Sequence, residues 1–193
     1  MLPVRGIFCL DVETDKLHGR AAFAIAAVVR DEGKTVAEFQ GRAPLPKHTS
    51  RFVKQVVLPA LATMKVTHDS ILKLEEDFWD FWMNYRDGRD CVAYFGNQGG
   101  EAALFNRLIL RKYKKRWVFP PAPLHEICTL MRARDWHDIH HMDKYMEKFH
   151  LCTECIPQCF HHPLFDAHAG AIVWEHLLAN DPDTTLKKNT PVV

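Results

Sequence analysis

The stretch Ile7-Phe8-Cys9-Leu10-Asp11-Val12-Glu13-Thr14 decides the fold of this chain. Its first four residues are apolar, as expected of a buried β-strand. Because successive side chains of a strand point to opposite faces, Asp11 and Glu13 project from the same face. Two carboxylates at the end of a buried strand are costly to leave unpaired, and carboxylate oxygens are preferred ligands of Mg²⁺ and Mn²⁺. The stretch therefore indicates a divalent metal site, with an exposed strand end that binds nothing as the alternative.

The bulk composition is that of one ordinary globular domain. The chain has 193 residues, of which 47% are hydrophobic and 25% are charged, so it can bury a sizeable core. The formal net charge of +1 excludes a globally basic protein, so any affinity for nucleic acid must come from a local patch. No stretch approaches the roughly 18 apolar residues that span a bilayer, and the first residues lack the apolar part of a signal peptide. We therefore expect no membrane partner and a cytoplasmic location.

Hydrophobic periodicity predicts a strand meander followed by alternating helices and strands. The predicted strands cover 4–13, 21–30, 34–40, 91–95 and 124–126, with Asp31-Glu32-Gly33 as a hairpin turn. The predicted helices cover 51–64, which Pro59 would break, then 71–85, 101–115, 128–134, 142–149 and 166–179. This order predicts an α/β fold with a mixed five-stranded sheet and helices on both faces. One domain would cover residues 1–180, with a polar tail over 181–193.

Two further carboxylates are predicted to lie at helix starts. Glu101 follows a glycine-rich turn over 96–100, and Asp166 follows His161 by five residues. The helix dipole favours a carboxylate in the first turn, so a stabilising cap is the alternative for both. His161 would lie in the loop before its helix, where an imidazole is free to act as a base near neutral pH.

These four carboxylates and the histidine resemble the DEDD superfamily of 3′–5′ exonucleases, in its histidine-containing branch. The matching residues are Asp11, Glu13 and Thr14 for the motif D-x-E-T, Asn97 and Glu101 for the second motif, and His161, Asp166 and Ala167 for H-x4-D-A. The resemblance spans residues 4–179 and implies an RNase H-like fold. One residue departs from the pattern, because the family normally carries Asp at the position of Glu101. The extra methylene moves that carboxylate by roughly 1.5 Å, which bears on the geometry of a second metal ion.

The resemblance implies a metal-dependent exonuclease that releases nucleoside 5′-monophosphates from the 3′ end of single-stranded DNA or RNA. It implies two Mg²⁺ or Mn²⁺ ions, and His161 as the general base that activates water. The implied metal ligands are Asp11, Glu13, Glu101 and Asp166, and the implied nucleotide-binding residues are Thr14, Leu17 and Asn97. The alternative, prompted by Glu101, is a catalytically impaired nuclease fold that binds nucleic acid or a protein.

A basic cluster near the end of the predicted 101–115 helix is the candidate path for the nucleic-acid strand. Basic side chains neutralise phosphates and aromatic rings stack on bases, and Tyr113 and Trp117 stand among these charges. The substrate-binding residues predicted from it are Arg111, Lys112 and Lys115. A cationic helix end that is stabilised by the helix dipole is the alternative.

Three cysteines lie close together near the end of the chain. Cys152, Cys155 and Cys159 could contribute to a zinc site, and reduced thiols near the surface are the alternative. The aromatic residues of the predicted 71–85 helix leave a homodimer open. Nothing in the sequence distinguishes DNA from RNA as the substrate.

Overall fold

The computed structural model describes residues 6–16, 21–94, 100–117, 119–133, 141–152 and 159–180. Its centre is a five-stranded sheet in the order β3-β2-β1-β4-β5. The strands are β1 (Gly6–Thr14), β2 (Ala22–Asp31), β3 (Lys34–Arg42), β4 (Arg89–Ala93) and β5 (Leu124–Glu126). Strand β2 runs antiparallel to β1 and β3, whereas β4 runs parallel to β1 and to β5. The predicted mixed five-stranded sheet is confirmed.

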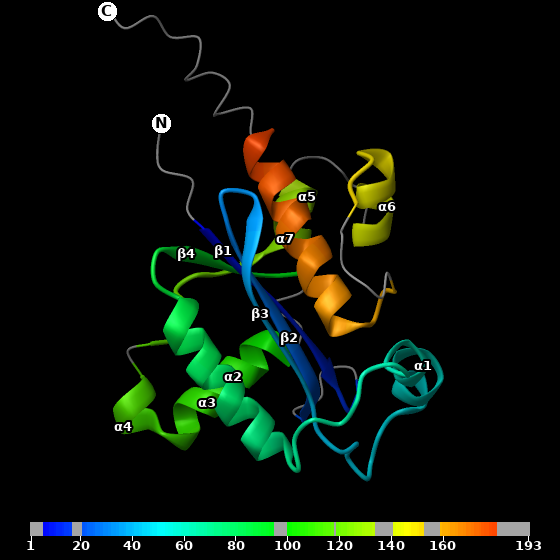
Figure 1. The fold of residues 1–193 in the computed structure, drawn as a ribbon, viewed down its shortest axis with the longest axis vertical. Coiled ribbons are helices and arrows are strands. Elements are labelled where there is room, and N and C mark those ends of the chain that lie inside the picture. The colour runs from blue at the N-terminus through cyan, green and yellow to red at the C-terminus, as the bar shows by residue number, and fades with distance from the viewer. Residues whose placement is uncertain are drawn as a thin grey trace, which may run out of the picture.

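Helices cover both faces of this sheet (Figure 1). On one face α2 (Ile71–Tyr85) and α3 (Gly100–Arg111) enclose an apolar core, and the short α4 (Tyr113–Arg116) extends from α3. On the other face a second core lies beneath α5 (Ile127–Ala133), α6 (Met142–Lys148) and α7 (Pro163–Ala179). A third, smaller core joins β2 to η1 (Val53–Val57) and α1 (Leu58–Ala60).

Strand β1 contributes to both main cores, because its side chains alternate between the two faces. Phe8, Leu10 and Val12 belong to the core under α2 and α3, whereas Ile7 and Cys9 belong to the core under α7. Asp11 and Glu13 continue the second series, so both carboxylates follow the α7 side of the strand. This confirms the predicted shared face and places it at the carboxyl end of β1.

Helix α7 approaches β1 unusually closely. A Cβ atom added to Gly170 would lie only 2.8 Å from Sγ of Cys9, and real Cβ atoms require more space than that. At Gly170 the backbone of this helix therefore packs directly on the sheet. Because Asp166 lies one helical turn before Gly170, the close packing brings its carboxylate toward the acidic end of β1.

Three predicted helices differ from the observed ones by more than one residue at an end, each for a local reason. The 51–64 region forms a π-helical segment, because Pro59 has no N–H to donate and the N–H of Leu58 bonds to the carbonyl of Val53. The predicted 101–115 helix ends at Arg111 and restarts at Tyr113, since Lys112 leaves the helical region with φ −132°. The last helix begins at Pro163, a residue suited to the first helical position.

Other expectations can be compared directly. The 71–85 helix and the 124–126 strand are confirmed at both ends. The hairpin turn is confirmed too, because Glu32 and Gly33 both have positive φ, of 51° and 78°. Within the described residues, no helix is both long and apolar enough to cross a membrane. Residues 181–193 lie outside the described residues, and the domain boundary at 180 stays a prediction.

Candidate active site

Side chains from three distant parts of the chain meet in one pocket of about 440 Å³. Strand β1 contributes Asp11 and Glu13 at its carboxyl end, α3 contributes Glu101 in its first turn, and the start of α7 contributes Asp166. His161, from the loop that leads into α7, lines the same pocket. All five predicted metal-binding and catalytic residues are therefore brought together.

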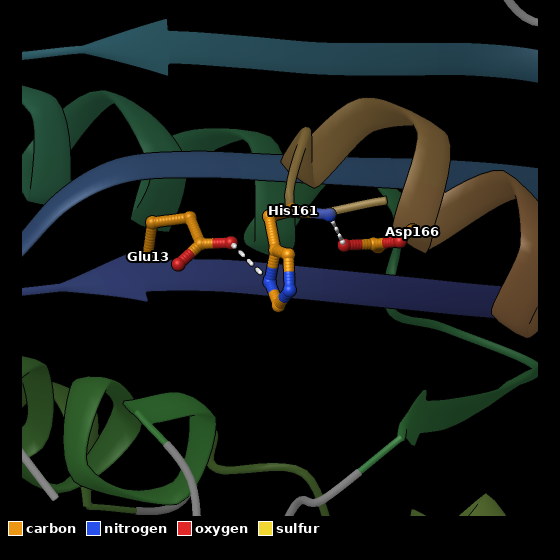
Figure 2. A group of neighbouring side chains, drawn as sticks. All are labelled: Glu13, His161 and Asp166. Carbon is orange, nitrogen blue, oxygen red and sulfur yellow. Dashed lines mark hydrogen bonds and ion pairs between the residues drawn. The ribbon is translucent and has the colours of Figure 1, made fainter. Parts of the chain in front are cut away.

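Figure 2 shows the part of this site that α7 and β1 build together. One ligand atom from each of Glu13, His161 and Asp166 can be chosen so that all three lie within 4.8 Å of one another. Nδ1 of His161 lies 3.9 Å from Oε1 of Glu13, and the imidazole remains 45% exposed whereas the carboxylate is only 13% exposed. A cation held here would contact both carboxylates next to a solvent-accessible imidazole.

The backbone of His161 is fixed by the neighbouring carboxylate. His161 has a φ of 67°, in the left-handed region that side-chain-bearing residues rarely adopt. Its N–H donates a 2.9 Å hydrogen bond to Oδ2 of Asp166. Asp166 is therefore not the N-cap of α7, a position that His162 occupies. It lies in the first turn and uses one carboxylate oxygen to hold the histidine in place.

Glu101 reaches the site because a glycine precedes it. A Cβ atom on Gly100 would lie 2.4 Å from Cγ2 of Val12 and 2.6 Å from Cγ2 of Thr14. Only a residue without a side chain lets α3 start this close to β1. The Glu101 carboxylate accepts hydrogen bonds from its own N–H and from the N–H of Val12. These hydrogen bonds hold the carboxylate of Glu101 in place, at the position where Asp was expected.

Three of the four carboxylates carry a buried oxygen without a partner. These atoms are Oδ2 of Asp11, Oε2 of Glu101 and Oδ1 of Asp166, and none has a hydrogen-bond donor among the described residues. A buried, unpaired carboxylate oxygen costs several kcal/mol, so such groups are normally paired or bound to metal. The donor set consists entirely of hard oxygen atoms with one imidazole nearby, which fits Mg²⁺ or Mn²⁺.

The electrostatics of the pocket point the same way. Burial raises the pKa of Asp11 well above its usual value, and the negative charges of the three neighbouring carboxylates raise it further. Burial, followed by repulsion from Asp166 and Glu101, also raises the pKa of Glu13. Burial raises the pKa of Glu101 to about 7 and that of Asp166 to about 7. Bringing these groups together in ionised form therefore needs a compensating positive charge.

This crowding predicts a specific link between pH, metal and stability. Carboxyl groups of the unfolded chain have a pKa of about 4, whereas in the folded protein burial raises the pKa of Glu101 and that of Asp166 to about 7. The folded state thus binds more protons between these values, so the metal-free protein should lose stability as the pH rises from about 4 through 7. Adding Mg²⁺ or Mn²⁺ should raise the melting temperature, and by more at pH 8 than at pH 6.

Calorimetry with and without EDTA at these two pH values measures this effect. Ca²⁺ and Zn²⁺ serve as comparison ions, because their preferred coordination differs. An equal metal-induced shift at both pH values, or no shift, would show that the carboxylates do not bind the ion together.

The remaining predicted substrate residues are found in different places. Thr14 lines the pocket, and its Oγ1 donates to the carbonyl of Lys16 at 2.8 Å. Leu17 and Asn97 lie outside the described residues, and their predicted roles stay predictions. Lys115 is exposed on α4, at the far end of α3 from Glu101.

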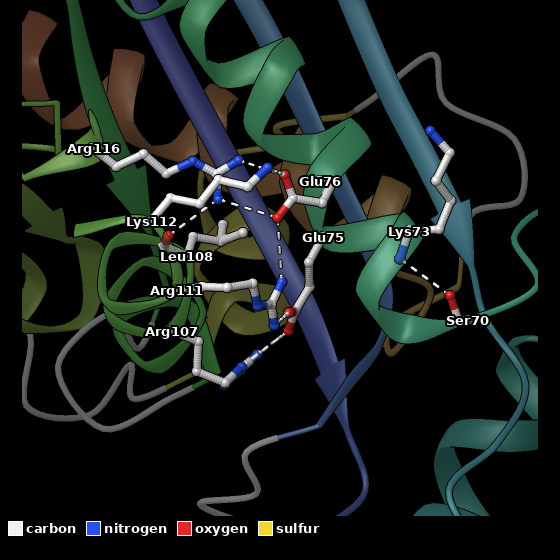
Figure 3. A network of polar contacts seen from close by, with 9 residues as sticks. All are labelled: Ser70, Lys73, Glu75, Glu76, Arg107, Leu108, Arg111, Lys112 and Arg116. Atoms are coloured by element: carbon white, nitrogen blue, oxygen red, sulfur yellow. Dashed lines mark hydrogen bonds and ion pairs between the residues drawn. The ribbon is translucent and has the colours of Figure 1, made fainter. Parts of the chain in front are cut away.

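Arg111 and Lys112 bind carboxylates of α2 rather than lying free (Figure 3). Arg111 contacts Oε2 of Glu75 at 2.6 Å, and Lys112 contacts Oε2 of Glu76 at 2.5 Å. Arg107 also binds Glu75, which is only 1% exposed, at 2.7 Å. These ion pairs give the basic cluster a structural function in joining α2 to α3 and α4, and its binding of nucleic acid stays a prediction.

Sequence reasoning missed several residues that line the pocket. They are Lys16, Phe52, Val53, Val57, Tyr94, His141, Met142, Asp143 and Phe160. The hydrophobic pattern treated Phe52 as part of a helix, and only the fold reveals that its ring lies 5.9 Å from that of His161. Of the three clustered cysteines, Cys152 is exposed and Cys159 half-buried, whereas Cys155 lies outside the described residues. Among the described residues, Glu13, His161 and Asp166 are the only group of three or more such side chains whose ligand atoms lie close enough together to hold one metal ion.

Comparisons with known proteins agree with this architecture. No protein-family model matches the chain, and no curated protein matches it. Among solved structures, the chain is similar to Exonuclease X in complex with 5′ overhanging duplex DNA, with a TM-score of 0.55 and 20% sequence identity. The likeness covers 91% of this chain and 92% of that chain. At this identity the likeness concerns the fold alone, and it confirms the predicted RNase H-like fold.

Proposed function

We propose that this protein is a metal-dependent 3′–5′ exonuclease that releases nucleoside 5′-monophosphates from single-stranded DNA or RNA. The observation that carries the proposal is the convergence of Asp11, Glu13, Glu101 and Asp166 beside His161, with three buried carboxylate oxygens left unpartnered. This charge crowding destabilises the folded state, and a binding module without catalytic activity would gain nothing from it. The resemblance of the sequence motifs and the likeness of the fold to an exonuclease both support it.

The four carboxylates are the residues that would hold divalent metal. Asp11, Glu13 and Asp166 would bind one ion, and Asp11 together with Glu101 would bind a second. Such ions stabilise the negative charge that develops on the attacking and leaving oxygens of a phosphodiester during hydrolysis. The oxygen atoms left without hydrogen bonds in Asp11, Glu101 and Asp166 are the ones available for this task.

His161 is suited to remove a proton from the attacking water. Partial burial lowers the pKa of its imidazole below the usual value of about 6.5, so the ring is neutral at pH 7. A neutral imidazole accepts a proton, whereas an imidazolium does not. The hydrogen bond from the backbone N–H of His161 to Asp166 couples the position of this base to a carboxylate that would bind metal.

The size of the pocket supports a single terminal nucleotide as the group that is handled. Its volume of about 440 Å³ is within the range of roughly 300–1,000 Å³ that is typical of sites for small ligands. A pocket of this size favours the end of a strand over the middle of a duplex. The similar solved structure contains 5′ overhanging duplex DNA, so a recessed 3′ end is the second substrate to test.

A digestion assay tests the proposal directly. Oligonucleotides of DNA and RNA labelled at the 5′ end should shorten into a ladder with Mg²⁺ or Mn²⁺ and remain intact with EDTA. A 3′-phosphate should block the reaction, and the released product should be a nucleoside 5′-monophosphate. A 5′ overhanging duplex compares a recessed 3′ end with the single strands. Absence of a ladder under both metals, together with retained binding, would instead favour the non-catalytic binding module.

A cytoplasmic location and a homodimer belong to the same proposal. Size-exclusion chromatography with light scattering checks the oligomeric state, and imaging of the tagged protein in its native cell checks the location.

A further inference from the structure

The segment 43–68, between β3 and α2, has an unusual charge distribution. It contains no Asp or Glu, although the whole chain has 24 acidic residues. Its basic residues Lys47, Arg51, Lys54 and Lys65 are all exposed. None of these four forms an ion pair within the described part of the chain, and Nε of Arg51 bonds only to the neutral Gln55 side chain at 3.1 Å. The segment therefore presents uncompensated positive charge.

The same segment is rich in exposed apolar side chains. It holds Leu45, Phe52, Val56 and Val66, four of the ten exposed large hydrophobic residues among those described. The largest of them, Phe52, is 53% exposed. Basic residues interleaved with an exposed aromatic ring are characteristic of surfaces that bind single-stranded nucleic acid, because charges bind phosphates and rings stack on bases.

The segment is also continuous with the carboxylate pocket. Phe52, Val53 and Val57 line the pocket, and the Phe52 ring lies 5.9 Å from the His161 ring in an edge-to-face arrangement. The N–H of Ser50 donates a 2.8 Å bond to the carbonyl of Asp15, which ties the start of the segment to the end of β1. Lys16, next along from that carbonyl, is exposed and lines the same pocket.

The basic cluster of α3 and α4 also has exposed aromatic rings, at Tyr113 and Trp117, but it differs in charge and in its distance from the pocket. Four of its cations bind α2 carboxylates, Arg107 and Arg111 through Glu75, and Lys112 and Arg116 through Glu76. Lys115 is not among them, but it lies beyond the end of α3. At 1.5 Å per residue, Glu101 and the end of α3 are about 15 Å apart. This cluster is thus both partly neutralised and remote from the carboxylates.

We propose that the single strand reaches the carboxylates over a basic strip, which we define as Lys16 together with segment 43–68. Phe52 stacks on a base next to the bond that is cut, while Lys16, Arg51 and Lys54 bind backbone phosphates. This inference deepens the proposed nuclease function and rests on it. It also makes the strip, rather than the end of α3, the main determinant of affinity.

The test measures binding separately from cleavage. In an Asp11→Asn background, fluorescence anisotropy follows binding of a labelled single-stranded 12-mer, as DNA and as RNA, over a series of salt concentrations. Phe52→Ala should weaken binding about tenfold, but it should have little effect on an oligonucleotide whose 3′-terminal positions lack bases. Lys16→Gln and Lys54→Gln should each lower the slope of log affinity against log salt by about 0.7. The matched control Lys115→Gln should change neither quantity.

The outcomes separate the strip from the nuclease. If the wild-type protein cleaves strands but the strip variants bind normally, the strand does not bind the basic strip, although the nuclease proposal is retained. The same conclusion follows if Lys115→Gln alone lowers the salt slope. If the wild-type protein does not cleave but the strip variants bind more weakly, the strand binds the basic strip and the proposed nuclease activity is wrong. No binding of either 12-mer overturns the strip. Because Phe52 and both lysines are exposed, thermal unfolding of each variant should match that of the parent.

Discussion

Asp11→Asn should reduce cleavage by at least about 10³-fold while raising the melting temperature of the metal-free protein. The loss follows because the amide oxygen is a much weaker ligand for a divalent ion, whose contribution to the transition state is several kcal/mol. The gain follows because burial raises the pKa of the Asp11 carboxyl, and the charges of three neighbouring acidic side chains raise it further. Removing one of the four charges relieves this repulsion in the folded state.

A lower cleavage rate together with a higher melting temperature makes this prediction specific to a metal site. Single-turnover cleavage rates and calorimetry in EDTA measure the two quantities on the same preparations. Asp87→Asn is the matched control, since its side chain is 85% exposed, lies outside the pocket, and should leave both nearly unchanged. Full cleavage by Asp11→Asn, or a lower melting temperature in EDTA, would contradict the assignment of Asp11 as a metal ligand.

His161→Asn should lower the cleavage rate by about 10²- to 10⁴-fold, the usual contribution of a general base. Asn is the informative replacement because it tolerates the left-handed conformation that His161 adopts, with φ 67°. The loop and its hydrogen bond to Asp166 should therefore be retained while the imidazole is lost.

The pH profile distinguishes a base from a merely structural residue. At saturating metal, the wild-type rate should fall below about pH 6 as the imidazole becomes protonated, because burial holds its pKa below about 6.5. His161→Asn should lose this part of the profile along with most of the rate. If the variant keeps the wild-type rate, the general base is another residue. His162→Asn then tests the neighbouring histidine.

Much of this site follows from local sequence patterns. The alternation in β1 put Asp11 and Glu13 on one face. The motif spacing identified Asp11, Glu13, Glu101 and Asp166, which line one pocket, although it missed Asp143. These features depend on neighbours within a few positions, which a sequence displays directly.

Features that depend on distant partners could not be inferred in the same way. Arg111 and Lys112 looked available to nucleic acid because Glu75 and Glu76 are more than 30 residues away in sequence, and only the packing of α2 on α3 pairs them. Phe52 carried no signal of its own, because its role depends on where the π-helical segment meets the loop of His161. Hydrophobic periodicity also cannot detect a turn in mid-helix such as that at Lys112.

The unpartnered oxygens of Asp11, Glu101 and Asp166 have a consequence for the life of the protein in a cell. If divalent ions relieve this crowding, they act as ligands of the native state and reduce the fraction of molecules that are unfolded at any moment. Proteases degrade the unfolded fraction, so the half-life of the protein would depend on metal supply. Starvation for the ion would then deplete the protein itself, and restored supply would bring its level back only as fast as new chains are synthesised.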